Sequence, residues 1–216
     1  MYNEITKRIL SSILLIPLSF FCIIKGSFFF NTFIIFIFII ASYEWYIMSK
    51  NKLYHIFGYL FLILSIYCCY LLRNIPEYNF QPFLVVAMIC ILTDVGGYIF
   101  GKTFKGPKLI KYSPNKTYSG LIGSFLLAIA LTPLFISFFE IINEPKFLNL
   151  IFFVTIVSAS SQFGDIIISY FKRSSNIKDS GKLIPGHGGI LDRFDGMIFA
   201  YPISYLLIIL NLFDIF

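Results

Sequence analysis

The segment near the C-terminal end of the chain combines basic residues, acids and glycines in a way that suits polyphosphate chemistry. From Ser169 to Gly196 it reads SYFKRSSNIKDSGKLIPGHGGILDRFDG. Basic side chains neutralise phosphate oxygens, glycines let backbone N–H groups approach an anion, and carboxylates hold a metal ion that bridges phosphates. The residues behind this prediction are Lys172, Arg173, Lys178, Lys182, Arg193, Asp179, Asp192, Asp195, Gly186, Gly188 and Gly189.

Further acids lie within or at the edge of apolar stretches, at Glu44, Asp94 and Asp165. An aspartate at the centre of a membrane helix costs about 2.5 to 3.5 kcal/mol on insertion scales, so these residues need a compensating role. A cluster of carboxylates requires a proton, a basic partner or a metal cation, because two like charges about 4 Å apart repel by about 4 kcal/mol at an effective dielectric of 20. Hard oxygen ligands beside a basic, phosphate-binding surface point to Mg²⁺, with a second cation left open.

The composition excludes a water-soluble domain. Hydrophobic residues make up 58% of the 216 residues and charged residues only 13%, and the mean hydropathy is +0.83. Too few polar residues remain to cover a soluble domain of this size, so much of the surface must face lipid. The four cysteines lie in apolar runs without a C-x-x-C pair, which indicates neither a zinc site nor an extracellular disulfide framework.

The predicted fold class is all-α, a polytopic integral membrane protein with about seven transmembrane helices. Each helix must cross about 30 Å of hydrocarbon at about 1.5 Å per residue. The apolar stretch from Ile9 to Met48 is about twice as long as one crossing requires, so we place a tight turn at Lys25 and Gly26. The predicted spans are 9–24, 27–48, 53–72, 80–101, 119–139, 147–171 and 196–213.

The distribution of positive charge predicts the orientation of these spans. Lys and Arg in short loops stay preferentially on the cytoplasmic side. With the N-terminus inside, fourteen of the seventeen Lys and Arg residues fall in inner segments, and only Lys25, Arg73 and Lys146 fall outside. We therefore predict a cytoplasmic N-terminus, an outer C-terminus and a location in a bacterial plasma (inner) membrane, with the acids converging on the cytoplasmic leaflet.

The chain is divided into two regions by this topology. Residues 1–80 are predicted to form three N-terminal membrane helices, and residues 81–216 a catalytic membrane domain. Its two basic loops, 102–118 and 172–195, are predicted to face the cytoplasm, where nucleotides are available.

The spacing within the C-terminal segment resembles the signature of phosphatidate cytidylyltransferases, the CDP-diacylglycerol synthases. That signature runs S-x-x-K-R-x4-K-D-x-G-x3-P-x-H-G-G-x2-D-R-x-D. It is matched at Ser169, Lys172, Arg173, Lys178, Asp179, Gly181, Pro185, His187, Gly188, Gly189, Asp192, Arg193 and Asp195. A chance match at so many fixed positions within 27 residues has a very low probability.

An upstream region also looks like this family. It is matched at Asp94, Gly96, Tyr98, Gly101, Lys102, Ser113, Pro114, Lys116 and Thr117. One position departs from the pattern, because Ser119 stands where the family usually has Glu. The resemblance covers the C-terminal two thirds of the chain well and the first 80 residues only in outline, through Arg8, Pro17 and Glu44-Trp45.

The resemblance implies Mg²⁺-dependent transfer of CMP from CTP to phosphatidic acid, giving CDP-diacylglycerol and pyrophosphate. It implies metal ligands at Asp165, Asp192 and Asp195, with Asp179 next, and phosphate contacts from Lys116, Lys172, Arg173, Lys178, Lys182 and Arg193. Substrate-binding roles are further predicted for Asp94, Ser169, Gly188 and Gly189, and a catalytic or phosphate-binding role for His187. The expected partners are CTP, phosphatidic acid, membrane lipid and a second copy of the chain, with no nucleic acid.

Several alternatives stay open at this stage. Glu44 could pair with a nearby Lys or Arg at the interface and only fix helix packing, and Ser169 could satisfy a backbone carbonyl of its own helix. The stripe of Lys102, Lys105, Lys108 and Lys111 is more typical of a headgroup-facing surface than of catalysis. At the level of the whole protein, the rivals are a CTP-dependent kinase of a polyprenol or phytol and, from a different class, an ion-coupled transporter.

Overall fold

The chain is almost entirely helical. The computed structural model describes residues 2–110, 113–139, 141, 146–181, 183, 188–213, 215 and 216. The helices are α1 (Tyr2–Lys25), α2 (Ser27–Ser49), α3 (His55–Arg73), α4 (Gln81–Phe104), α5 (Tyr118–Phe138), α6 (Phe147–Ser174), α7 (Leu191–Phe194) and α8 (Met197–Ile209). Two short strands, β1 (Lys108–Ile110) and β2 (Ser113–Thr117), pair antiparallel.

Five of these helices, α2 to α6, are long and apolar enough to cross a membrane, and two shorter apolar helices span Ile13–Lys25 and Met197–Ile209. All seven predicted segments are therefore helical, and the chain is a mostly helical membrane protein, as predicted. Within the described residues the four cysteines are buried and unpaired, so they serve as core side chains.

The predicted turn between the first two helices is confirmed. α1 ends at Lys25, α2 begins at Ser27, and Gly26 between them has a φ of +63°, a backbone conformation that glycine adopts without strain. The Arg73 side chain from α3 closes over this turn, and its Nη2 donates to the carbonyl of Ile23 at 3.0 Å.

Close approach between α4 and α5 depends on glycine. A Cβ at Gly96 would lie 2.6 Å from the carbonyl oxygen of Gly123, and one at Gly120 would lie 2.8 Å from that of Gly97. These glycines let the two helix backbones approach closely, and Gly58 on α3 likewise packs against the Trp45 ring of α2.

The largest apolar cluster includes side chains from both sides of the boundary proposed at residue 80. Phe30 and Leu72 from the first region and Val86, Ile89 and Phe153 from the second are all essentially inaccessible. The division into two regions itself stays a prediction.

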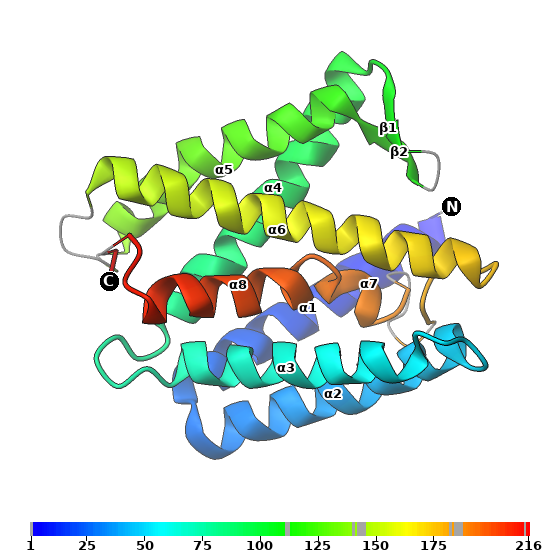
Figure 1. Cartoon of the computed structure of the whole chain (residues 1–216), viewed down its shortest axis with the longest axis horizontal. Helices are drawn as coiled ribbons and strands as arrows, with labels where there is room; N and C mark the ends of the chain where they lie inside the picture. Colours follow the sequence, from blue (N-terminus) through cyan, green and yellow to red (C-terminus); the bar gives the residue numbers. More distant parts are fainter. Residues whose placement is uncertain are drawn as a thin grey trace.

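Two features near the basic loops were not predicted. The loop at 102–118 contains the β1–β2 hairpin, and the last predicted span is preceded by a separate turn of helix, α7, which breaks from α8 at Asp195 and Gly196. Figure 1 shows this hairpin, the N-terminus, the α2–α3 turn and α7 gathered toward one end of the helix bundle, with the C-terminus and the α3–α4 connection at the other.

Candidate active site

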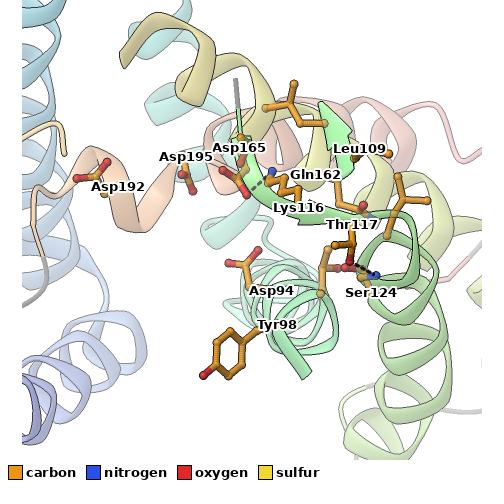
Figure 2. A pocket seen from close by; sticks show the side chains of 16 residues that line it. Asp94, Tyr98, Leu109, Lys116, Thr117, Ser124, Gln162, Asp165, Asp192 and Asp195 are labelled. Atoms are coloured by element: carbon orange, nitrogen blue, oxygen red, sulfur yellow. Dashed lines mark hydrogen bonds and ion pairs between the residues drawn. The ribbon is translucent and has the colours of Figure 1, made fainter. Parts of the chain in front are cut away.

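A polar cavity of about 370 Å³ opens between α4, α5, α6, the hairpin and the α7–α8 junction. Its charged lining comes from segments far apart in sequence (Figure 2): Asp94 on α4, Lys116 on β2, Asp165 on α6, and Asp192 and Asp195 around α7. The predicted convergence of acids from separate helices is therefore present, with Glu44 the exception.

Asp94 is placed by a helix that is fixed on either side of it. The neighbouring Thr93 is buried and its hydroxyl donates to Ser158 Oγ on α6 at 2.9 Å, while Gly96 seats α4 against α5. This packing turns the Asp94 side chain away from the core, and it is exposed at the cavity wall.

Asp165 forms the closest ion pair of the cavity. Lys116 Nζ lies 2.5 Å from its Oδ2, and the Ser169 hydroxyl, one helical turn along α6, donates to its Oδ1 at 3.3 Å. About a quarter of each ion-pair side chain remains accessible, 24% for Lys116 and 29% for Asp165, so both can still reach a ligand.

Asp195 stands beside Asp165 in the break between α7 and α8 (Figure 2). α6 admits it because Gly164 has no side chain there: a Cβ at Gly164 would lie 2.5 Å from the backbone oxygen of Asp195. Burial, followed by repulsion from Asp165 and Asp94, raises the pKa of Asp195 well above its ordinary value, although Lys172 acts in the opposite direction.

Asp192 lies at the edge of the same cavity, but its oxygens are more fully engaged. Lys172 Nζ contacts its Oδ1 at 2.7 Å, and the backbone N–H groups of Ser180 and Gly189 donate to its Oδ2 at 2.8 and 3.1 Å. Burial alone would raise the pKa of Asp192, but the Lys172 contact and the two N–H groups outweigh it and hold the pKa below its usual value.

The donor set fits a hard divalent cation. Asp94, Asp165, Asp192 and Asp195 offer only carboxylate oxygens to the cavity, which are the ligands that Mg²⁺ prefers. Asp94, Asp165 and Asp195 line the same cavity, and like charges in one cavity favour a shared positive charge. No group of three or more His, Cys, Asp or Glu side chains is already gathered at ion-binding distance within the described part of the chain.

The remaining predicted site residues are placed differently. Arg173, Lys178, Asp179 and Arg193 are exposed and do not line the cavity. Gly188 and Gly189 pass close to Asp192, and Gly188 has a φ of +83°. Lys182 and His187, together with Lys111, lie outside the described residues.

Several uncharged residues that line the cavity were not predicted as site residues. Thr117, a matched motif position, caps α5 by accepting the N–H of Gly120 at 3.1 Å, and Gln162 lies one helical turn before Asp165. Within the described structure the buried Gln162 Nε2 has no hydrogen-bond partner, so this amide is available to a ligand. Tyr98 was noted only as a motif position, and the i, i+4 spacing from Asp94 could have placed it beside that residue.

Glu44 is the clearest correction to the sequence-based interpretation. It was considered a candidate for pairing with Lys or Arg at the membrane interface, but its side chain is 2% exposed and accepts hydrogen bonds from Ser180, Ile190 and Leu191. The physical reason is that the loop after α6 folds back over the end of α2 and supplies neutral donors.

Comparison with known proteins agrees with this site. Residues 55–211 match the model of the cytidylyltransferase family, and the chain belongs to that family. This confirms the prediction of a nucleotidyl-transferring enzyme.

Individual relatives extend the similarity to almost the whole chain. A "Phosphatidate cytidylyltransferase" of Rickettsia felis is 38% identical over 96% of this chain and 94% of its own length. One of Rickettsia bellii is 39% identical over 95% and 91%, and one of Staphylococcus saprophyticus is 37% identical over 80% and 66%.

Proposed function

We propose that this protein is a phosphatidate cytidylyltransferase, which transfers CMP from CTP to phosphatidic acid and releases pyrophosphate. The observation that carries the proposal is the cavity in which Asp94, Asp165 and Asp195 face Lys116. The chain also matches relatives of that name over nearly the full length of both proteins.

The reaction requires one bond to form and one to break. A phosphate oxygen of phosphatidic acid attacks the α-phosphorus of CTP, and the bond from that phosphorus to the bridging oxygen of the β-phosphate breaks. Because the lipid phosphate is already an anionic nucleophile at neutral pH, the protein mainly aligns the two phosphates and neutralises charge. No side chain has to form a covalent intermediate.

The residues in and beside the cavity suit these tasks. Lys116 in the cavity and Lys172, which contacts Asp192 at its edge, can exchange their carboxylate contacts at 2.5 and 2.7 Å for phosphate oxygens, and Gln162 and Thr117 can donate to the nucleotide. Mg²⁺ would be held by the predicted set Asp165, Asp192 and Asp195, with Asp94 as a further oxygen donor. When bound, the ion supplies positive charge to the triphosphate and its leaving pyrophosphate.

The same proposal includes a topology. Seven helices cross a bacterial plasma membrane, with the hairpin and the 172–195 loop on the cytoplasmic side. Support comes from the charge bias of the sequence and from the grouping of the N-terminus, hairpin and α7 toward one end of the bundle in Figure 1. A homodimer stays a prediction from family resemblance.

The decisive experiment follows the two ends of the triphosphate separately. Purified protein in mixed micelles receives phosphatidic acid, Mg²⁺ and CTP labelled at either the α or the γ phosphate, with a polyprenol as the parallel acceptor. We expect α label in the lipid phase with phosphatidic acid only. Label from the γ position in the polyprenol would identify a lipid kinase instead, and no lipid label from either position would return the transporter to consideration.

A further inference from the structure

Glu44 is the most deeply buried acid among the described residues, and it lies outside both the cavity and the family match at 55–211. Its Oε1 accepts the N–H of Ile190 at 2.9 Å, and its Oε2 accepts the Leu191 N–H and the Ser180 hydroxyl, both at 2.8 Å. A buried carboxylate without hydrogen-bond donors is strongly unfavourable, so these three hydrogen bonds are what stabilise the Glu44 side chain in its buried position.

The donors lie far apart in the connection between α6 and α7. Ser180 comes before the segment 181–188 in sequence and Ile190 and Leu191 come after it, so Glu44 joins the residues on either side of this segment. Asp192 also joins residues on either side of it, since its Oδ2 accepts the N–H groups of Ser180 and Gly189. We call these contacts of Glu44 and Asp192 with residues 180 and 189–191 the loop clasp.

Glycines make room for the clasp. A Cβ at Gly181 or at Gly189 would overlap the Glu44 carboxylate, so neither position accepts a larger residue while Glu44 holds the loop. The clasp also reaches the cavity, because the Asp192 carboxylate that receives Ser180 and Gly189 is the one that binds Lys172.

We propose that Glu44 is a positioning residue for nucleotide binding, which joins Ser180 to Ile190 and Leu191 and thereby fixes Asp192, with its partner Lys172, at the edge of the cavity. The inference rests on the proposed function for its kinetic readout. It gives the N-terminal region a part in the reaction, since α2 supplies the acceptor on which the loop is folded.

The test compares substitutions at the clasp with a matched buried position on the same helix. Glu44→Gln keeps the size of the side chain but replaces one acceptor oxygen with a donor, Glu44→Asp keeps the charge, and Ser180→Ala removes a single donor. Ser49→Ala is the control, because Ser49 is also fully buried on α2 and its hydroxyl bonds Trp45 and His55 rather than the loop.

In full-length protein reconstituted in lipid, we expect Glu44→Gln to raise the KM for CTP by about tenfold to a hundredfold, the range expected for losing hydrogen bonds to a buried charge. Glu44→Asp should recover part of this loss, and Ser180→Ala should raise KM less than Glu44→Gln, because it removes only one of the three hydrogen bonds to the carboxylate. If KM is unchanged and Glu44→Gln loses only as much active protein as Ser49→Ala does, Glu44 has a structural role alone. That result would overturn the inference.

A second readout does not depend on activity. Leu183 is 54% exposed and the native cysteines are buried, so Leu183→Cys offers a single accessible position for a nitroxide spin label. Glu44→Gln should increase the mobility of that label in its electron paramagnetic resonance spectrum, whereas Ser49→Ala should not. Equal spectra would overturn the clasp, while an altered spectrum in a protein that transfers no CMP would refute the proposed function alone.

Discussion

The cavity and the loop clasp both contain carboxylates from separate segments of the chain, but they satisfy them in opposite ways. Asp94, Asp165 and Asp195 line one cavity, and among the described residues Lys116 forms its ion pair with Asp165. Glu44 in the clasp has no such neighbour described, and its two oxygens accept bonds from three neutral donors.

This difference distinguishes a candidate chemical site from a structural site when both contain acidic side chains. A carboxylate whose acceptors are filled by the protein has completed its interactions, whereas carboxylates that repel one another retain a need for positive charge. Asp192 is part of both the clasp and the cavity edge, because its Oδ2 accepts the backbone N–H groups of the clasp and its Oδ1 contacts Lys172.

The largest effect should come from removing charge in the cavity. Asp165→Asn is expected to lower the rate of CMP transfer by about 10²- to 10³-fold, since preorganised electrostatic stabilisation is usually the largest contribution to such reactions. The thermal unfolding midpoint should change little, because the Asp165 side chain is 29% exposed and its ion pair with Lys116 is partly solvated.

Initial rates with α-labelled CTP measure this effect. The matched control is Glu77→Gln, an exposed acid in the connection between α3 and α4 at the opposite end of the bundle, which should keep the wild-type rate. A rate for Asp165→Asn within a factor of about three of wild type would remove Asp165 from the site.

A smaller effect is expected from the cation that faces these acids. Lys116→Gln should raise the KM for CTP by about tenfold to a hundredfold, because a charge-assisted contact to phosphate is lost. Lys108→Gln, an exposed lysine on the neighbouring strand, serves as the control and should leave KM unchanged. Equal effects of the two substitutions would mean that only the overall basic charge of the hairpin matters.

The smallest expected effect is on the free energy of unfolding, which should distinguish Asp192 in the clasp from Asp195 in the cavity. Asp192→Asn should lower the free energy of unfolding by about 1 to 3 kcal/mol, because the amide cannot accept all the bonds made by the carboxylate. Asp195→Asn should be neutral or stabilising, because the raised pKa of Asp195 means that its charged form destabilises the folded state.

Unfolding at two pH values tests the sign. The stabilising contribution of the Asp192 charge is present above its unfolded pKa and is lost as pH falls through its lowered folded pKa. The stability difference between wild type and Asp192→Asn should therefore shrink in acid. A stability difference that is independent of pH would show that the charge of Asp192 does not stabilise the clasp.

Much of the fold could be predicted from hydropathy and charge, because both act over whole segments. The seven apolar runs are helical, and the turn at Gly26 falls where the length of the apolar stretch required it. The hairpin was missed because strands as short as Lys108–Ile110 contain too few residues for a periodic pattern. The break at Asp195 was missed because it depends on contact between α6 and the α7–α8 junction at Gly164.

The charged lining of the cavity could be predicted where charges stand out in the sequence, as at Lys116 and Asp195 within the motifs and at Asp165 within an apolar stretch. The same motif could not reveal which basic members reach the site, since exposed Arg173 and Lys178 match it as well as Lys172, which contacts Asp192. The partners of Glu44 could not be predicted for a physical reason: two of the three are backbone N–H groups 146 and 147 positions away in sequence, and backbone donors leave no trace in a pattern of side chains.

The most direct test of the cavity as the reaction site is a crystal structure with α,β-methylene-CTP and Mn²⁺ in place of Mg²⁺, located by its anomalous signal. We predict a metal peak at ligand distance, about 2.0 to 2.3 Å, from oxygens of Asp165 and Asp195, with the triphosphate beside Lys116. A bound triphosphate whose metal lies away from these carboxylates, for example at the exposed Asp179, would contradict the assignment of the site.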